Sequence, residues 1–413
     1  MPNTTLTASI IAKEALVILE NELGVLGTFY RPHEQEFSKK VNGYRVGESI
    51  SIRRPADFTV RSGATLAVQD VIEGATTLVV DQQRGVDFEF TSQDLTLRID
   101  DLSERVIKPA MSSIINNITS DVLTQLYRRT YNWVGTIGQT VNSFADFALA
   151  PERLDLMAVP QDGRCAVLHP QDHWGLLGSQ TSLFVNDIAK PAYRKGSMGM
   201  IGGVEVMMSQ TAPVHTVGPL GGTPLVNGGS QAVSYDTARN TWTQTLVTDG
   251  WTAAAAQRLR AGDVFTIANV NSVNPKTKQT TGVLQQFVVI NDASSDAAGN
   301  LTATISPPII VSGPHQTVTG APADNAAITV NGTAGQQPRQ NLVYHKNAMA
   351  LAMVPLEMPP AAYGAARESY KDMSVRVIPV YDGTNDVSRW RLDVLYGRAL
   401  IDPRLATRLS GSP

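Results

Sequence analysis

Apolar residues near the start of the chain recur at helical spacing. Within residues 7–26, Ile11, Ala15, Ile18 and Leu19 fall on one side of a helix, because residues three and four apart are neighbours on a helix surface. The pattern predicts an amphipathic helix. Its apolar stripe has to be buried either on its own domain or on a neighbouring chain, and the sequence leaves both open.

Residues 44–98 alternate between apolar and polar positions, which is the pattern of strands. The alternation is clearest over residues 47–53, 77–81 and 86–90. We expect residues 82–85 to join the last two segments as a hairpin. A ribbon of this kind buries little apolar surface by itself and is marginal in water, so its length indicates support from a partner chain.

The clearest helical pattern covers residues 102–131, where apolar residues from Ile107 to Leu126 trace one face. Ser103 is a suitable N-cap. Pro109 lies inside the pattern and predicts either a kink or a late start of the helix. At ~1.5 Å per residue, a helix of about thirty residues reaches ~45 Å, which is long for a compact domain.

The rest of the chain predicts one α/β domain interrupted by an all-β insertion. Residues 143–215 combine helical and strand patterns. Short strand patterns separated by turns then recur to about residue 342, with one short helix expected over residues 253–260, and this is typical of a small β-barrel or sandwich. Mixed patterns return afterwards and end in a hairpin at residues 382–385. The predicted fold class is α+β.

Composition narrows the function classes further. Charged residues make up 17% of the chain, and 33 glycines and 23 prolines favour a loop-rich, β-rich structure. A net charge of −3 argues against a sequence-reading nucleic-acid binder. The single cysteine, Cys165, excludes a disulfide framework and any multi-cysteine metal site. We expect neither a membrane span nor a signal peptide.

No familiar catalytic, metal or cofactor motif is complete. His169 and His173 are four apart, as in a helical zinc pair, but Pro170 places His169 at the helix start and no Glu follows it. A capping or surface histidine pair explains them better. The glycine-rich residues 196–203 precede a strand, whereas a dinucleotide site needs a helix there. We therefore expect no catalytic residue, no metal, no cofactor and no enzymatic activity.

The order of these parts resembles the major capsid proteins of tailed bacteriophages with the Hong Kong 97-type fold. Residues 47–60 resemble the start of the extended E-loop, residues 100–110 the start of the spine helix of the P-domain, and residues 196–213 a loop of the A-domain. The order of the segments is more specific than any one of these short matches.

The sequence is most similar to the coat proteins of the short-tailed Salmonella phage group, which carry an insertion domain. His169-Pro170-Gln171-Asp172-His173 is similar to their Asn-Pro-Gln-Asp-Tyr, and residues 192–196 resemble their Ala-Tyr-Arg-Asp-Gly. In that group a charged loop of the insertion joins neighbouring capsomers. Residues 234–250 hold only three charged side chains, so we do not transfer this role. The Lys–Asn cross-link of the founding phage is not assigned either.

The resemblance implies a division of the whole chain. The implied parts are an N-terminal arm (1–31), a P-domain with the spine helix (32–43 and 91–134), an E-loop (44–90), the first part of the A-domain (135–219), an inserted barrel-like β domain (220–342), and a return to the A- and P-domains with a C-terminal hairpin (343–413).

The function that the resemblance implies is self-assembly, as hexamers and pentamers, into the icosahedral shell that encloses phage double-stranded DNA. The implied location is the virion capsid, assembled in the bacterial host cytoplasm. The implied partners are further copies of the chain, a portal protein, packaged DNA held non-specifically and, because no long extension precedes the arm, a separate scaffolding protein.

Two other functions remain open on the sequence, namely another oligomeric phage structural protein of the tail or adaptor type, and a hydrolase with an inserted β module. The shell function predicts contacts between subunits on the arm and the E-loop. The candidate inter-subunit contacts are Ile11, Ile18, Arg53, Arg54, Phe58, Arg84 and Phe88.

Overall fold

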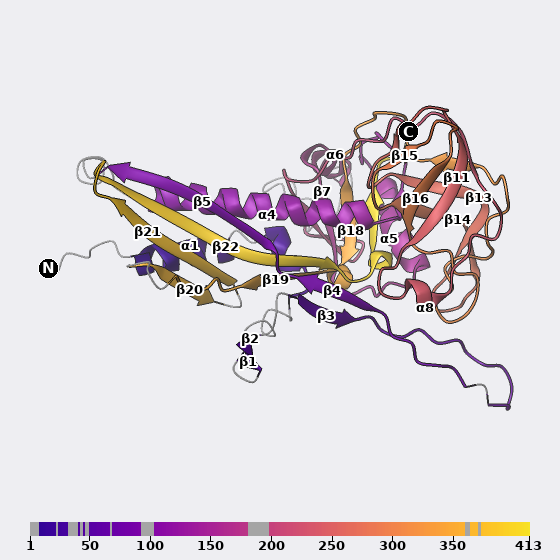
Figure 1. The fold of residues 1–413 in the computed structure, drawn as a ribbon, viewed down its shortest axis with the longest axis horizontal. Helices are drawn as coiled ribbons and strands as arrows, with labels where there is room; N and C mark the ends of the chain where they lie inside the picture. The colour runs from indigo at the N-terminus through magenta and orange to yellow at the C-terminus, as the bar shows by residue number, and fades with distance from the viewer. Residues whose placement is uncertain are drawn as a thin grey trace. The chain divides into compact units, whose positions relative to one another are not determined.

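The computed structural model describes ten stretches of the chain, namely residues 8–21, 24–31, 40–41, 44–45, 49–66, 68–91, 103–180, 198–359, 364–370 and 373–413 (Figure 1). The chain forms two compact units, each assembled from segments that are distant in sequence. The first unit contains Met1–Ser51, Thr77–Val122 and Met349–Ala399, and the second contains Ile52–Thr76, Leu123–Ala348 and Leu400–Pro413.

The first unit is built on an antiparallel sheet of long strands. Its strands are β5 (Gln82–Thr91), β19 (Met349–Val354), β20 (Ala366–Tyr370), β21 (Met373–Asp382) and β22 (Val387–Leu400). They lie in the order β19-β22-β21-β20, and β5 also pairs with β22. The predicted hairpin at residues 382–385 is confirmed, because β21 and β22 pair up to Asp382 and Val387.

Two helices that contribute to this unit carry the apolar patterns seen in the sequence, and the second of them belongs to it as far as Val122. The first, α1 (Ala8–Asn21), packs on β20 and β21, and its Ser9 hydroxyl donates to Glu368 at 3.0 Å. Its apolar stripe is therefore buried on the chain's own unit, which decides between the two possibilities that the sequence left open. The second, α4 (Lys108–Arg129), follows a π-helical turn at Ser103–Ile107, so a late start near Pro109 is confirmed.

The spine-like helix α4 lies over one face of the sheet. The Tyr396 hydroxyl of β22 donates to Asp121 at 2.7 Å, and Arg84 Nε of β5 donates to Asn117 at 3.0 Å. Alternate residues of a strand point to opposite sides of the sheet. The face turned away from α4 therefore has its own set of side chains, and these include an ion pair. Asp393 there accepts from Arg376 at 2.7 Å.

The predicted hairpin at residues 82–85 is wrong. These residues begin β5, where Gln82 pairs with Tyr396 and Gly85 with Asp393. The strand before them, β4 (Ala75–Val79), pairs instead with β3 (Ser49–Arg53). A Cβ on Gly85 would collide with the Leu392 carbonyl oxygen, so this glycine marks a close approach of two strands and not a turn.

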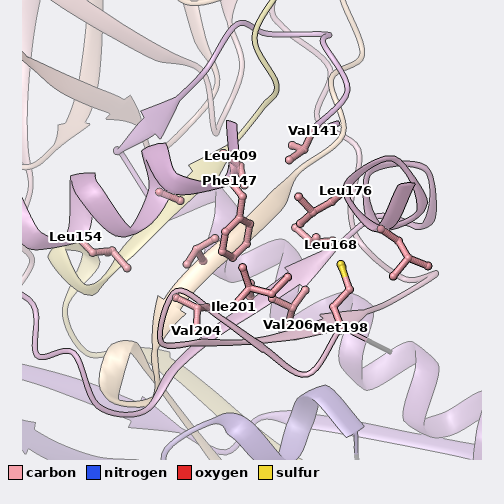
Figure 2. Packing of buried hydrophobic residues seen from close by; sticks show 14 of the residues in the cluster. Val141, Phe147, Leu154, Leu168, Leu176, Met198, Ile201, Val204, Val206 and Leu409 are labelled. Atoms are coloured by element: carbon pink, nitrogen blue, oxygen red, sulfur yellow. The ribbon is translucent and has the colours of Figure 1, made fainter. Parts of the chain in front are cut away.

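The α/β part of the second unit surrounds a six-stranded mixed sheet. Its strands are β6 (Trp133–Val134), β7 (Arg164–Leu168), β8 (Met200–Ile201), β9 (Val204–Met208), β18 (Asn341–His345) and β23 (Ala406–Leu409), in the order β6-β23-β18-β7-β9-β8. The helices α5 (Phe144–Leu156) and α6 (Pro170–Gln180) pack on it. Figure 2 shows the shared core, where the Phe147 ring lies among side chains from the helices and the strands.

The β part of the second unit is an antiparallel module. Its main strands are β10 (Gly222–Val226), β11 (Gln244–Trp251), β13 (Val264–Val273), β14 (Thr280–Val289), β16 (Leu301–Ser306) and β17 (Ile328–Val330). A separate pair is formed by β12 (Ala256–Leu259) and β15 (Ala293–Ser295). The helix expected over residues 253–260 is therefore wrong, because pairing with a distant strand overrides the helical propensity of an alanine-rich stretch.

The remaining elements are short. They are β1 (Lys40–Val41), β2 (Tyr44–Arg45), the helix α8 (Tyr235–Ala238), and the 3₁₀ turns η1 (Gly24–Thr28), η3 (Lys346–Ala348) and η4 (Pro403–Leu405). Residues 100–102, 192–197 and most of 32–43, which carried parts of the sequence predictions, lie outside the described residues. Among the residues that the structure describes, no helix combines the length and the apolar character that a membrane crossing requires.

The core of Figure 2 yields a direct test of packing. The fully buried Phe147 and the half-exposed Phe144 lie on the same helix, α5. Replacing Phe147 with Ala leaves a cavity and should lower the free energy of unfolding by about 3–5 kcal/mol. Phe144→Ala is the matched control and should change it by no more than about 0.5 kcal/mol. Urea unfolding followed by tryptophan fluorescence measures both, and equal effects would contradict this packing.

Candidate assembly surfaces

Among the described residues of the second unit, the three most exposed large apolar side chains are Val60, Val68 and Leu66. They lie on one loop between β3 and β4, residues 54–74, whose course is seen in Figure 1. We call it the assembly loop. Its residues that the structure describes form neither helix nor strand. Its exposed apolar side chains range from 55% exposed at Phe58 to 95% at Val60, and they are Phe58, Val60, Leu66, Val68 and Val71. A group of apolar side chains this exposed makes the loop a candidate interaction surface.

Hydrogen bonds hold the two sides of the assembly loop together. The Gln69 side chain accepts from the backbone N–H of Thr59 at 2.9 Å and donates to the Thr59 carbonyl at 2.6 Å. At the root, the Arg54 N–H donates to the Gly74 carbonyl at 2.7 Å. The loop is therefore braced at two levels although it lacks regular structure.

The root of the loop is fixed by a buried arginine. Arg54 is only 6% exposed, and its Nη2 donates to the carbonyl oxygens of Arg239 and Asn240 at 2.7 and 3.2 Å. Its guanidinium lies over the Trp242 ring, 5.5 Å from the centroid. Burial lowers the pKa of Arg54, and the charge of Asp402 opposes this shift.

A second anchor is the buried carboxylate of Asp57. It accepts from Arg404 Nη1 at 2.9 Å and from Lys276 Nζ at 3.3 Å, and His315 Nδ1 lies 3.7 Å away. Burial alone would raise the pKa of Asp57, but Arg404 and Lys276 hold it below its usual range. The carboxylate therefore stays charged inside the unit.

Arg404 connects both anchors. It bonds to Asp402 through Nε and Nη2 at 2.9 and 2.8 Å, and its guanidinium lies 5.6 Å from the centroid of the Trp242 ring. Burial alone would lower the pKa of Arg404, but Asp402 and Asp57 raise it above its usual value. We call Arg54, Asp57, Trp242, His315 and Arg404 the loop clamp.

His315 closes the loop clamp from the β module. Its ring stacks on Tyr235 at a centroid distance of 3.5 Å and an angle of 11°. Burial lowers the pKa of His315 to about 4; the charge of Asp57 opposes this shift, and the positive charges of Arg404, Lys278 and Arg54 add to it. The imidazole is therefore neutral near pH 7.

The structure distributes the seven candidate contacts unevenly. Phe58 and Arg53 are exposed, and Arg53 pairs with Glu73 at 3.1 Å. Ile11 and Arg54 are buried within the chain, so their side chains leave a neighbouring subunit almost no surface to touch. The half-buried candidates are Ile18, Arg84 and Phe88.

The histidine pair of the sequence does not gather further ligands. His169 Nδ1 accepts from the backbone N–H of Gln171 at 3.3 Å, at the start of α6, which agrees with a capping role. Asp172 is engaged by Arg339 at 2.9 Å. Within the described stretches, no group of three or more His, Cys, Asp or Glu side chains could hold a metal ion.

The comparison with known proteins decides the family. The chain matches the family model of the P22 coat protein, gene protein 5, over residues 34–411. This chain belongs to the P22 coat protein family. A curated relative, the major capsid protein of Acyrthosiphon pisum secondary endosymbiont phage 1, is 22% identical over 394 residues, which is 92% of each chain.

Two solved structures illustrate the range of similarity. A chain from Mycobacterium phage Che8 is 13% identical and covers 93% of this chain and 89% of its own, with a TM-score of 0.48. The CUS-3 coat protein I-domain is 30% identical and covers 27% of this chain and 97% of its own, with a TM-score of 0.20. The family assignment rests on the family match.

Family membership confirms the main predictions from the sequence. The protein is a tailed-phage major capsid protein, a structural subunit that assembles with copies of itself into the virion shell, and it is not an enzyme. The predicted α+β class is confirmed by the elements themselves.

The buried histidine of the loop clamp predicts an acid-dependent loss of stability. His315 titrates at its usual pKa of 6.5 when unfolded but at about 4 when folded. The unfolded state therefore binds more protons between these values, and the free energy of unfolding should fall by about 1–3 kcal/mol as the pH drops from 6.5 to 4. Urea unfolding at several pH values measures this slope.

The control for that experiment is His315→Phe, which keeps a ring against Tyr235 but cannot titrate. Its stability should fall less steeply with acid than that of the wild type. Some slope should remain, since burial also lowers the pKa values of His169, His215 and His345. Parallel slopes for the variant and the wild type would show that His315 is not held neutral.

Proposed function

We propose that this coat protein builds its shell from hexamers and pentamers in which the assembly loop of each subunit packs on a neighbouring subunit. The observation that carries the proposal is the group of exposed apolar side chains on a loop whose root is fixed. A flexible tail could also expose apolar residues. Here the bracing by Gln69 and by the loop clamp presents them in one arrangement.

The energy available to such a contact is sufficient for assembly. Full burial of one Val, Leu or Phe side chain contributes about 1.5–3 kcal/mol. The loop offers five such side chains, although only part of each would be buried. Because each subunit in a closed shell makes several contacts at once, interfaces that are modest singly add up through multivalency.

The candidate contacts contribute to the proposal in different ways. Phe58 belongs to the exposed apolar group, and Arg53 lies at the loop root with most of its side chain free for a rim contact. Ile18, Arg84 and Phe88 retain part of their surface for a neighbour. Ile11 and Arg54 act inside the subunit, where they order the elements that make the contacts.

The domain division is also proposed with one revision. The run of strands from β10 to β17 supports an inserted β domain over residues 220–342. The position of α1, on the sheet of the first unit, fits an arm that is anchored at residues 8–21. The E-loop, however, should not extend to residue 90, because β5 belongs to that sheet. We place its outer part at residues 49–79.

The other partners follow from the family resemblance. We propose a separate scaffolding protein, a portal protein, and packaged double-stranded DNA held without sequence preference, with assembly in the cytoplasm of the bacterial host. A net charge of −3 supports enclosure of DNA over tight binding.

Electron microscopy of the purified protein tests the need for a scaffold. Without a second protein we expect few closed shells, and those of mixed size. Uniform closed shells from the pure protein would contradict the scaffolding proposal.

The assembly loop is tested by placing a charge on it. Val60→Asp puts a carboxylate at the most exposed apolar position, where it would be buried in the proposed contact. We expect the fraction of protein in shells to fall at least tenfold, since burying one unpaired charge costs more than about 1.4 kcal/mol. The unfolding curve of the free subunit should not change, because Val60 is solvent-exposed there. Sedimentation through sucrose measures the fraction assembled.

The matched control is Ser62→Asp, which adds the same charge to the same loop without removing an apolar side chain. Ser62 is exposed and polar already. The Ser62→Asp variant should assemble nearly as well as the wild type. If Val60→Asp assembles like Ser62→Asp, the apolar side chains of the loop are not at an interface.

A further inference from the structure

We infer that the inserted β module sets the direction of the assembly loop, and that the loop clamp is the positioning device. This rests on the proposed contact between the loop and a neighbouring subunit. The residues concerned all lie in the second unit. They touch the loop at its root and leave its exposed apolar side chains free.

The module grips the loop root on both of its sides. On the outgoing side, Arg54 bonds to two carbonyl groups just after α8, and Asp57 accepts from Lys276 of the module. Arg404 of η4, outside the module, holds Asp57 from a third direction. On the returning side, the Ala75 N–H donates to Asn240 Oδ1 at 3.3 Å. Three separate contacts fix an orientation, whereas a single contact would leave the loop free to pivot.

The returning side also fits closely against the module. A Cβ on Gly74 would collide with the Arg239 carbonyl oxygen and come within 2.9 Å of the Tyr235 hydroxyl. No φ in the left-handed region requires a glycine at this position, so close approach is what favours it. The Gly74 contact is therefore a sensitive point at which to loosen the root without altering the module's own core.

The gripping segment of the module is itself ordered. Ser234 caps α8, its hydroxyl accepting from the Thr237 N–H, and the Trp242 N–H donates to the Ala238 carbonyl at 2.7 Å. Trp242 is buried and presents its ring to both Arg54 and Arg404. Residues 234–242 thus contact and position the assembly loop of the same subunit.

The β module is held firmly to the α/β part of the same unit. The Gln286 side chain bonds to both the N–H and the carbonyl of Trp133, at 2.6 and 2.8 Å. The buried Arg408 of β23 donates to the carbonyls of Thr130 and Gly262 at 2.9 and 2.8 Å. A loop fixed to the module is therefore also fixed to the sheet of this unit.

The experiment compares two variants that loosen the root from opposite sides. Arg54→Met removes the carbonyl bonds from the loop side, and Gly74→Ala pushes the returning side away from Arg239. Gly320→Ala is the control, since a Cβ there meets nothing within 4 Å and the residue lies in the same module. All are made in the full chain.

The first readout is amide hydrogen exchange in residues 58–72 of the free subunit. Exchange there should be about tenfold faster in Arg54→Met and Gly74→Ala than in the wild type, which is the factor expected from losing one hydrogen bond to a charged group. Exchange in β13 and β14 should not change. If the loop exchanges as in the wild type, or if the whole module loosens with it, the loop clamp is only a stabilising cluster.

The second readout is the shape of the shells formed in infected cells that carry each variant gene, where every partner is present. Both root variants should give shells of mixed size or open sheets by electron microscopy, and Gly320→Ala should give uniform shells. Uniform shells from root variants whose loop exchanges faster would overturn the inference. If Val60→Asp also assembles normally, the interface proposal fails, while the exchange result still reports whether the module positions the loop.

Discussion

The ion pair between Asp57 and Arg404 is the contact on which the geometry of the second unit's loop depends. The two residues are 347 positions apart and meet at 2.9 Å inside the unit. A buried carboxylate is costly unless it is compensated, and Arg404, with Lys276, provides that compensation for Asp57. Asp402 in turn compensates Arg404, and Trp242 offers its ring to the guanidinium groups of Arg54 and Arg404. Loss of one member would leave an uncompensated charge for the others.

This constraint separates a fixed root from an exposed tip, and that separation suits a shell subunit. Ordering a flexible segment during association costs conformational entropy, and a segment that is already ordered avoids that cost. The assembly loop therefore meets a neighbour with its apolar side chains already arranged. The N-terminal helix behaves differently, because Ile11 and Leu19 are buried on the chain's own unit. The apolar stripe of α1 thus stabilises the subunit itself, whereas the apolar side chains of the assembly loop remain exposed to a neighbouring subunit.

The elements that could be predicted from the sequence are those whose pattern is local. The helical period of α4 and α5 and the alternation of β13, β14 and β16 needed no knowledge of partners. The errors at residues 82–85 and 253–260 arose where a partner strand distant in sequence decides the structure, β22 in one case and β15 in the other. Only part of the candidate surface was predicted from the sequence, namely Phe58. Val60 and Leu66 are separated by turn residues, so the sequence pattern gave no sign that both are exposed on the same loop. Nothing local to Asp57 or Trp242 indicates that both contact Arg404.

The Arg53–Arg54 doublet shows where a physical rule would have improved the prediction. Both arginines were expected to contact another subunit. Successive side chains at the end of a strand point to opposite sides, and the structure places the Arg53 side chain in solvent, 80% exposed, while Arg54 turns inward to the module. The alternation over residues 47–53 that predicted this strand thus already contained the division of roles between a surface contact and an internal anchor.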